Sequence, residues 1–264
     1  MSNRHKERHC ALITGSVQGI GLAIAERLAK AGVDIILHGL EPDADGRKIA
    51  ARLALEHAIE AAYVRADLVH ESEAETLVAH AAAALRHPDI LVNNAGIQFT
   101  SPVESFPVER WNAILAVNLT SAFFSMRAAL PWLRQRQWGR IINIASVHGL
   151  VASVNKTAYL ASKHGLVGLS KGVALEAAAA GVTVNCICPG WTDTPIIAPQ
   201  IAARAEQFSG DREAAVRDLL REKQPNLTLL QPDQIAEVVA FLCSDAASGI
   251  TGVALPVDGG WTAQ

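Results

Sequence analysis

The residues best suited to chemistry lie in one stretch, residues 139–163, with the sequence GRIINIASVHGLVASVNKTAYLASK. Tyr159 and Lys163 are four residues apart, so on a helix they share one face, and Lys156, three residues before Tyr159, joins it. Two ammonium groups beside one phenol near a helix N-terminus, where cations are disfavoured, have no obvious value for stability. A nearby cation favours the phenolate, so we expect the pKa of Tyr159 to lie below its usual value of about 10. Such a tyrosine can act as a general acid or base on an alcohol or ketone.

The rest of the chain supplies elements that can position these residues. Seven short apolar segments predict strands: CALITG, VDIILHG, AAYVRADL, DILVNNAG, GRIINI, VTVNCICPG and VALPVDGG. Helical segments alternate with them, and no linker, repeat or low-complexity tract interrupts the pattern. The alternation predicts an α/β fold, a single doubly wound Rossmann-type domain over residues 1–264, with a mainly parallel seven-stranded sheet and helices on both faces.

A glycine-rich turn, TGSVQGIG at residues 14–21, follows the first predicted strand and precedes the helix LAIAERLAKAG. Clustered glycines let the backbone approach a phosphate that the helix N-terminus then faces. An ordinary tight turn is the alternative, but the position between strand and helix favours dinucleotide binding. The residues expected to contact the cofactor here are Gly15, Gln18, Gly19, Ile20 and Gly21.

The end of the second predicted strand should meet the adenosine ribose. NAD-binding folds often carry an acidic residue there, but this chain has Gly39 and Leu40, with Glu41 just beyond, so the usual acid is missing. No Arg or Lys stands at 39–41 or at Gln18 to hold a 2′-phosphate. We therefore predict NAD rather than NADP, with Leu40 among its contacts.

Two further strand ends should reach the cofactor. Asp67 follows the third strand and could contact the adenine, although a helix cap or turn is an equally good interpretation. Asn94, Ala95 and Gly96 follow the fourth strand, and ligands of open parallel sheets bind beyond the carboxyl ends of strands.

Composition excludes several classes of protein. Half the residues are hydrophobic and the net charge is -3, with both signs scattered, so no basic stripe indicates nucleic-acid binding. The N-terminal SNRHKERH has no apolar segment behind it and does not resemble a secretory signal. We also expect no apolar run long enough to span a bilayer. Together these features predict a cytoplasmic protein.

Two smaller features need an interpretation. Cys186 and Cys188 lie two apart in a predicted strand and face the same side. They could form a metal or redox pair, but without a CxxC or histidine pattern buried thiols are favoured. Residues from about 193 to 225 are charged and helical and follow a strand end, which predicts a helical substrate lid. An exposed helical excursion is the alternative.

At this point the chain resembles the short-chain dehydrogenase/reductases, over residues 8 to 264. The matching motifs, in family order and spacing, are TGSVQGIG, NNAG, Asn118, Ser146, Tyr159 with Lys163, and the PG at 189–190. The resemblance implies that Tyr159 is the acid/base, that Ser146 binds the reacting oxygen, and that Lys163 lowers the pKa of Tyr159 and holds the ribose hydroxyls. It also implies that Asn118 supports a water relay to Lys163, although an Asn among apolar helix residues is more often a buried amide whose hydrogen bonds are satisfied within the protein. The further cofactor contacts that it implies are Leu68, Pro189, Gly190, Thr192 and Thr194.

Within this family the chain is most similar to the bacterial D-3-hydroxybutyrate dehydrogenases. The shared segments are GIQ, NIASVHGLVAS, ICPGW, EKQP and VDGGWTAQ. This resemblance implies NAD-dependent interconversion of (R)-3-hydroxybutyrate and acetoacetate by a homotetramer. It places Gln98, His148, Lys156 and Gln200 around the substrate carboxylate, with Lys156 and His148 supplying positive charge, and Trp191 on the methyl end. It also implies that Trp261 reaches a neighbouring subunit's site. We expect no metal in the active site, although some relatives bind a divalent ion at the C-terminal carboxylate, here that of Gln264.

Two departures and two alternatives remain. Thr192 and Asp193 stand where that group carries apolar residues, and the effect of the Asp193 charge on the nicotinamide end is open. The lid differs in detail as well, which leaves the preferred chain length open. A reductase or dehydrogenase of a longer 3-hydroxy or 3-oxo acid or acyl thioester would be a different enzyme, and the thioester reductase would need NADPH and a basic residue near the adenosine. A cofactor-bound scaffold without catalysis would tolerate loss of Ser146, Tyr159 or Lys163, yet all three are present.

Overall fold

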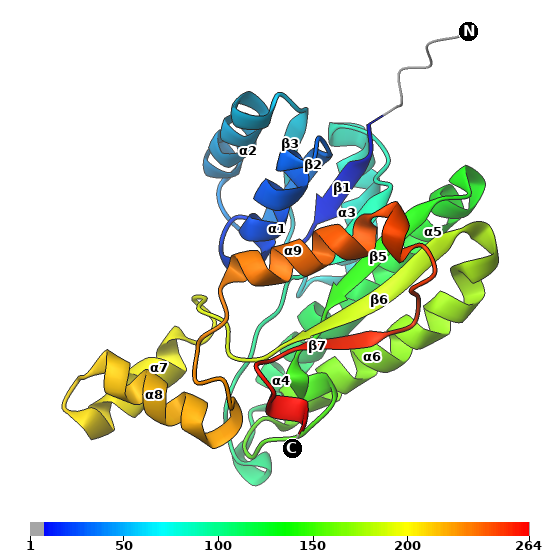
Figure 1. Ribbon diagram of the computed structural model, residues 1–264. Helices are drawn as coiled ribbons and strands as arrows, with labels where there is room; N and C mark the ends of the chain where they lie inside the picture. Colours follow the sequence, from blue (N-terminus) through cyan, green and yellow to red (C-terminus); the bar gives the residue numbers. More distant parts are fainter. Residues whose placement is uncertain (1–7, 264) are drawn as a thin grey trace, which may run out of the picture.

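The computed structural model describes residues 8–263, and within them seven parallel strands form one sheet in the order β3-β2-β1-β4-β5-β6-β7 (Figure 1). The strands are β1 (Cys10–Ile13), β2 (Asp34–Gly39), β3 (Ala61–Arg65), β4 (Ile90–Asn93), β5 (Gly139–Ile144), β6 (Val182–Pro189) and β7 (Ala254–Val257). Each neighbouring pair is parallel, which confirms the predicted fold class. The order reverses between β1 and β4, and a crevice at such a switch point is where ligands bind.

Helices cover both faces of this sheet. They are α1 (Gly19–Lys30), α2 (Asp43–His57), α3 (Glu71–Ala84), α4 (Val108–Leu115), α5 (Ser121–Arg136), α6 (Thr157–Ala177), α7 (Ala198–Ala205), α8 (Arg212–Lys223) and α9 (Pro232–Cys243). One core joins α1, α2 and α9 to the sheet, and the other joins α3, α5 and α6 to the opposite face. Alternate residues of β1 enter the two cores, Ala11 and Ile13 on one side and Cys10 and Leu12 on the other. Burial on both faces explains why the strands are continuous apolar runs.

The region 193–225 leaves the carboxyl edge of the sheet and forms the helices α7 and α8, which project from the body of the domain (Figure 1). These helices share a small apolar cluster of their own, which includes Ile197, Ile201 and Leu219. Arg204 of α7 also pairs with two carboxylates of α8. The segment is therefore a unit built around its own contacts, as a lid must be if it moves as a body. Its motion stays a prediction.

The long helical region 108–136 is divided. A π-helical turn, η2 (Ala116–Thr120), separates α4 from α5. The helical run Val108–Arg136 is long and apolar enough to cross a membrane by length and composition, so the expectation that no segment reaches that length is wrong. Its buried side chains, such as Met126 and Leu133, belong to the core beneath the sheet, where α5 packs against α3 and α6.

The cysteines are free and buried. Cys186 and Cys188 both lie in the core under α6, where the Cys186 Sγ donates to the Ser170 Oγ at 3.0 Å. Burial raises the pKa of the Cys188 thiol to about 12, which confirms the interpretation as inert buried thiols. Within residues 8–263 no group of three or more His, Cys, Asp or Glu side chains could hold a metal ion. Gln264 and residues 2–7 of the polar N-terminus lie outside the described residues.

Candidate functional site

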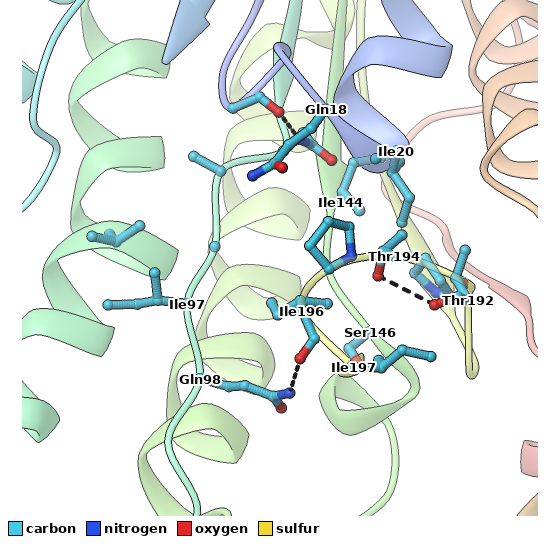
Figure 2. A pocket seen from close by; sticks show the side chains of 18 of the residues that line it. Gln18, Ile20, Ile97, Gln98, Ile144, Ser146, Thr192, Thr194, Ile196 and Ile197 are labelled. Carbon is cyan, nitrogen blue, oxygen red and sulfur yellow. Dashed lines mark hydrogen bonds between the residues drawn. The ribbon is translucent and has the colours of Figure 1, made fainter. Parts of the chain in front are cut away.

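A cavity of about 400 Å³ runs along the carboxyl edge of the sheet, from the glycine turn to the lid (Figure 2). Its lining includes almost every residue that the sequence analysis assigned to cofactor or substrate. The exceptions are Gly21, Asn118 and Gln200. Gly21 packs against the backbone of the glycine turn, and Asn118 lies outside the lining, where it is hydrogen-bonded to the lining residue Ile97. Gln200 lines an adjoining cavity of about 550 Å³, which shares Lys156 with the first.

The glycine turn is shaped to hold a phosphate group. Gly15 and Gly19 have φ values of 60° and 56°, in the left-handed region that favours glycine. A Cβ on Gly15 would lie 3.1 Å from the Cα of Ala95, so the turn packs closely on the end of β4. Gln18, the N-cap of α1, makes no side-chain cap, which leaves the first N–H groups of the helix available to an anion. These features fit the pyrophosphate of a dinucleotide.

His38, near the end of β2, is a site residue that sequence reasoning missed. Its Nδ1 accepts from the Gly15 N–H at 3.0 Å, and its Nε2 lies 3.1 Å from the Ala66 carbonyl oxygen. Burial lowers its pKa to about 4, so the ring is neutral at pH 7 and its Nε2 carries the proton. The imidazole thus ties the glycine turn to the end of β3. The histidine directly after the apolar run at residues 35–37 is the sequence feature that could have indicated this role.

Asp67, after β3, has the turn role that was one of its two sequence interpretations. Its Oδ1 accepts from the Val69 N–H at 3.0 Å, which closes a turn, and the residue also lines the cavity beside Leu68. Contact with the adenine stays a prediction.

The catalytic candidates meet where β5 ends and α6 begins. Burial raises the pKa of Tyr159 to about 12, and the nearby Ser146 side chain, which favours the phenolate, offsets only part of this rise. The Lys163 Nζ lies 5.7 Å from the centroid of the tyrosine ring and donates to the Ile144 carbonyl at 2.7 Å. Burial lowers the pKa of Lys163 to about 8. The expectation that the pKa of Tyr159 lies below 10 is therefore wrong for this structure, because desolvation of the phenolate is the largest influence on it.

Asn118 lies in the π-helical turn, and such turns are frequent at functional sites. Its Oδ1 accepts from the Ile97 N–H at 2.8 Å, and its Nδ2 donates to the Ile97 carbonyl at 2.9 Å and to the Ser162 Oγ at 3.1 Å. The side chain is a satisfied buried amide that fixes the segment carrying Gln98. The water relay to Lys163 stays a prediction.

Lys156 lies at the far end of the cavity from the glycine turn. It is the N-cap of α6, one residue before the helix, so it does not share a helical face with Tyr159 as expected. Its side chain is buried, with Nζ 3.0 Å from the Gln200 Oε1 and 4.9 Å from the centroid of a ring of Trp191. Burial lowers its pKa to about 8. No Asp or Glu of residues 8–263 forms an ion pair with it, and the Gln200 Nε2 and Trp191 Nε1 are buried without a partner.

His148 and Trp261 complete this end of the cavity. The His148 Nδ1 lies 3.3 Å from the Ser146 Oγ and the Nε2 3.0 Å from the Ser153 Oγ. Burial, with the charge of Lys156 adding to it, lowers the His148 pKa to about 3. His148 is therefore neutral, and the expectation that it supplies positive charge is wrong. Trp261 packs against His148 of its own chain, at 5.5 Å between centroids, and its reach into a neighbouring subunit's site stays a prediction.

The lid contacts the site through Gln98. The Gln98 Nε2 donates to the Ile196 carbonyl at 3.0 Å (Figure 2). Asp193, one of the two departures from the resemblance, is exposed, does not line the cavity, and pairs with Arg212 of α8 at 3.2 Å. Thr192, the other, is buried and donates to the Gly190 carbonyl at 3.1 Å. Thr192 therefore lines the cavity at the lid hinge, whereas Asp193 makes its contact on the outside of the lid.

A known protein family and several known proteins are similar to this chain over most of its length. A family model described as enoyl-(acyl carrier protein) reductase matches residues 15–262. The chain is 49% identical over 254 residues to the D-beta-hydroxybutyrate dehydrogenase of Cupriavidus necator, covering 96% of this chain and 98% of that protein. The chain belongs to the short-chain dehydrogenase/reductase family.

Further matches agree with this membership. The D-beta-hydroxybutyrate dehydrogenase of Rhizobium meliloti is 46% identical over 254 residues, with 96% of this chain and 98% of that protein covered. The crystal structure of L-sorbose reductase from Gluconobacter frateurii, complexed with NADPH and L-sorbose, matches with a TM-score of 0.92 at 30% identity and covers 97% of each chain. As a short-chain dehydrogenase/reductase, the protein is an oxidoreductase of small molecules with a nicotinamide cofactor.

Proposed function

We propose that the protein oxidises (R)-3-hydroxybutyrate to acetoacetate with NAD and catalyses the reverse reduction. The observation that carries the proposal is Lys156, a buried ammonium that forms no ion pair with an acidic residue among residues 8–263. A buried charge is costly unless an anion or hydrogen bonds compensate it. The unpartnered Gln200 Nε2 and Trp191 Nε1 add neutral donors beside it. A small carboxylate satisfies all three groups, and the two relatives named D-beta-hydroxybutyrate dehydrogenases support that substrate.

The remaining residues can perform the reaction on such an acid. With the carboxylate at Lys156, the substrate hydroxyl can reach Ser146 and Tyr159, because these residues line the same cavity. NAD, when bound, accepts the hydride from C3 of the substrate. Tyr159 takes the hydroxyl proton in the oxidation and returns it in the reduction. Ser146 holds the oxygen on which charge develops, and Lys163 favours the phenolate.

NAD is the proposed cofactor because no Arg or Lys occupies positions 39–41 or 18 at the adenosine end of the cavity. A 2′-phosphate would need such a cation. The glycine turn and the uncapped N-terminus of α1 hold the pyrophosphate that both cofactors share.

We also propose a cytoplasmic homotetramer. The free state of the four cysteines supports a reducing compartment. Phe123 on α5 and Leu175 on α6 are large apolar side chains that stay exposed on the single chain, which supports pairing of these helices between subunits.

Steady-state kinetics with NAD and NADP tests the proposal on three substrates: (R)-3-hydroxybutyrate, its (S) form and a longer (R)-3-hydroxy acid. We expect fast NAD-linked oxidation of the (R) four-carbon acid. Activity only with the longer acid, or only with NADP, would reject the proposed substrate or cofactor while leaving the tyrosine chemistry in place. Cofactor binding without turnover of any substrate would favour the scaffold alternative.

The pH dependence should differ between the two directions. Because the pKa of Tyr159 is raised to about 12, its phenol is protonated at pH 7, and oxidation, which needs the phenolate, should accelerate as pH rises. Reduction needs the protonated phenol and should slow over the same range. Above about pH 8, loss of the Lys156 proton should raise the KM for the hydroxy acid. Initial rates measured from pH 6 to 10 in both directions test this. The same pH slope for oxidation and for reduction would contradict the assignment of Tyr159 as the acid and base.

A further inference from the structure

The adenosine end of the cavity contains an acidic group that the sequence analysis judged to be missing. Gly39 is the last residue of β2, where dinucleotide folds place an acidic side chain, and it has none to offer. Glu41 stands two residues further on and yet lines the same cavity, together with Gly39 and Leu40.

The turn after β2 directs this carboxylate back towards the strand. The Tyr63 hydroxyl donates to the Glu41 carbonyl at 2.8 Å, and the Arg65 Nε donates to the Leu40 carbonyl at 3.2 Å, so neighbouring β3 fixes the backbone of the turn. The Glu41 Oε2 then lies directly over Gly39, where the Cβ of any other residue would collide with it. The absence of a side chain at position 39 is therefore what makes room for the carboxylate of Glu41.

One oxygen of the Glu41 carboxylate has no hydrogen-bond partner within the described residues. The Glu41 Oε2 is buried and forms no hydrogen bond there. A buried charged acceptor without donors carries a desolvation cost, which a ligand with hydroxyl groups at this position would remove. A ligand with a phosphate at the same position would instead place two negative charges next to each other. Arg65, the nearby cation, binds the Leu40 carbonyl and does not line the cavity.

We propose that Glu41, folded back over Gly39, accepts hydrogen bonds from the adenosine ribose hydroxyls of NAD and repels the 2′-phosphate of NADP. This inference rests on the proposed use of NAD and assigns that preference to one side chain. Gly39 is the second determinant, because it gives the carboxylate its place.

Isothermal titration calorimetry of NAD and of NADP, without hydroxy acid, tests the assignment. Glu41→Gln keeps the shape of the side chain and removes its charge, so we expect NAD to bind about tenfold or more weakly and the NAD-to-NADP affinity ratio to fall by more than that. Gly39→Ala, which displaces the carboxylate without removing it, should shift the ratio in the same direction. The matched control is Glu109→Gln, because Glu109 is exposed on α4 and does not line the cavity.

The assignment is overturned if Glu41→Gln leaves the ratio within twofold of the wild-type value, or if the wild-type protein binds NADP as tightly as NAD. Thermal unfolding of each variant checks that it is folded, and Gly39→Ala decides the matter if Glu41→Gln is not. The readout is independent of the proposed substrate, since no hydroxy acid is present. A changed ratio without 3-hydroxybutyrate turnover would reject the proposed substrate alone, and turnover with an unchanged ratio would reject Glu41 alone.

Discussion

Tyr159→Phe should lower kcat for (R)-3-hydroxybutyrate oxidation by about a thousandfold and leave the affinity for NAD nearly unchanged. General acid–base catalysis contributes about 10²- to 10⁴-fold to enzymatic rates, and Tyr159, which lines the cavity with Ser146, is the proposed proton acceptor. The substitution removes one oxygen atom and keeps the buried ring, so the packing around it should survive. Initial rates of NADH formation give kcat, and isothermal titration calorimetry gives the NAD dissociation constant.

The double variant Tyr159→Phe with Ser146→Ala is the informative control. Because the two hydroxyls act on the same substrate oxygen, the double variant should lose little more activity than Tyr159→Phe alone. Near-normal kcat in Tyr159→Phe would reject the mechanism. A large loss of NAD affinity would show instead that the phenol serves mainly in cofactor binding.

Lys156→Ala should raise the KM for the hydroxy acid by about a hundredfold and change the KM for NAD by less than about threefold. A hydrogen bond to a charged group contributes roughly 1.5–3 kcal/mol, and loss of the buried ammonium also leaves the substrate carboxylate without its counter-charge. The Lys156 Nζ is held between Gln200 and Trp191, at the opposite end of the cavity from the glycine turn. Cofactor and substrate effects should therefore separate.

Lys171→Ala is the matched control, because this lysine is exposed on the same helix and does not line either cavity. It should leave both KM values as they are. Gln98→Ala should act in the same direction as Lys156→Ala but more weakly, since it removes a neutral donor that also contacts the lid at the Ile196 carbonyl. If Lys156→Ala affects the KM of NAD as strongly as that of the acid, Lys156 does not bind substrate.

Periodicity and motif spacing were sufficient for the fold. The double-sided burial of strands such as β1 produces apolar runs without alternation, and the helices between them require parallel pairing. The same information located the glycine turn, Ser146, Tyr159 and Lys163, because short-range spacing within one strand–turn–helix unit fixes their neighbourhood.

The pKa values of the site residues depend on how deeply the fold buries them, and the spacing of residues along the sequence does not show this. The residue types alone indicated an acidic Tyr159 and a cationic His148, yet desolvation raises the pKa of the first and keeps the second neutral. The surroundings that desolvate them come from elements distant in the sequence, including Trp261 near the C-terminus.

The sequence by itself determined the fold class and selected the candidate catalytic residues, since both follow from local patterns that physical chemistry restricts to few structures. Only the tertiary structure decided which groups face one another across the cavity. It brought His38 onto the glycine turn and laid the Glu41 carboxylate over Gly39, a position set by hydrogen bonds from β3. Contacts of this kind depend on how neighbouring strands align and on the space left where a glycine has no Cβ. They join residues that are distant in the sequence, so local sequence patterns do not reveal them.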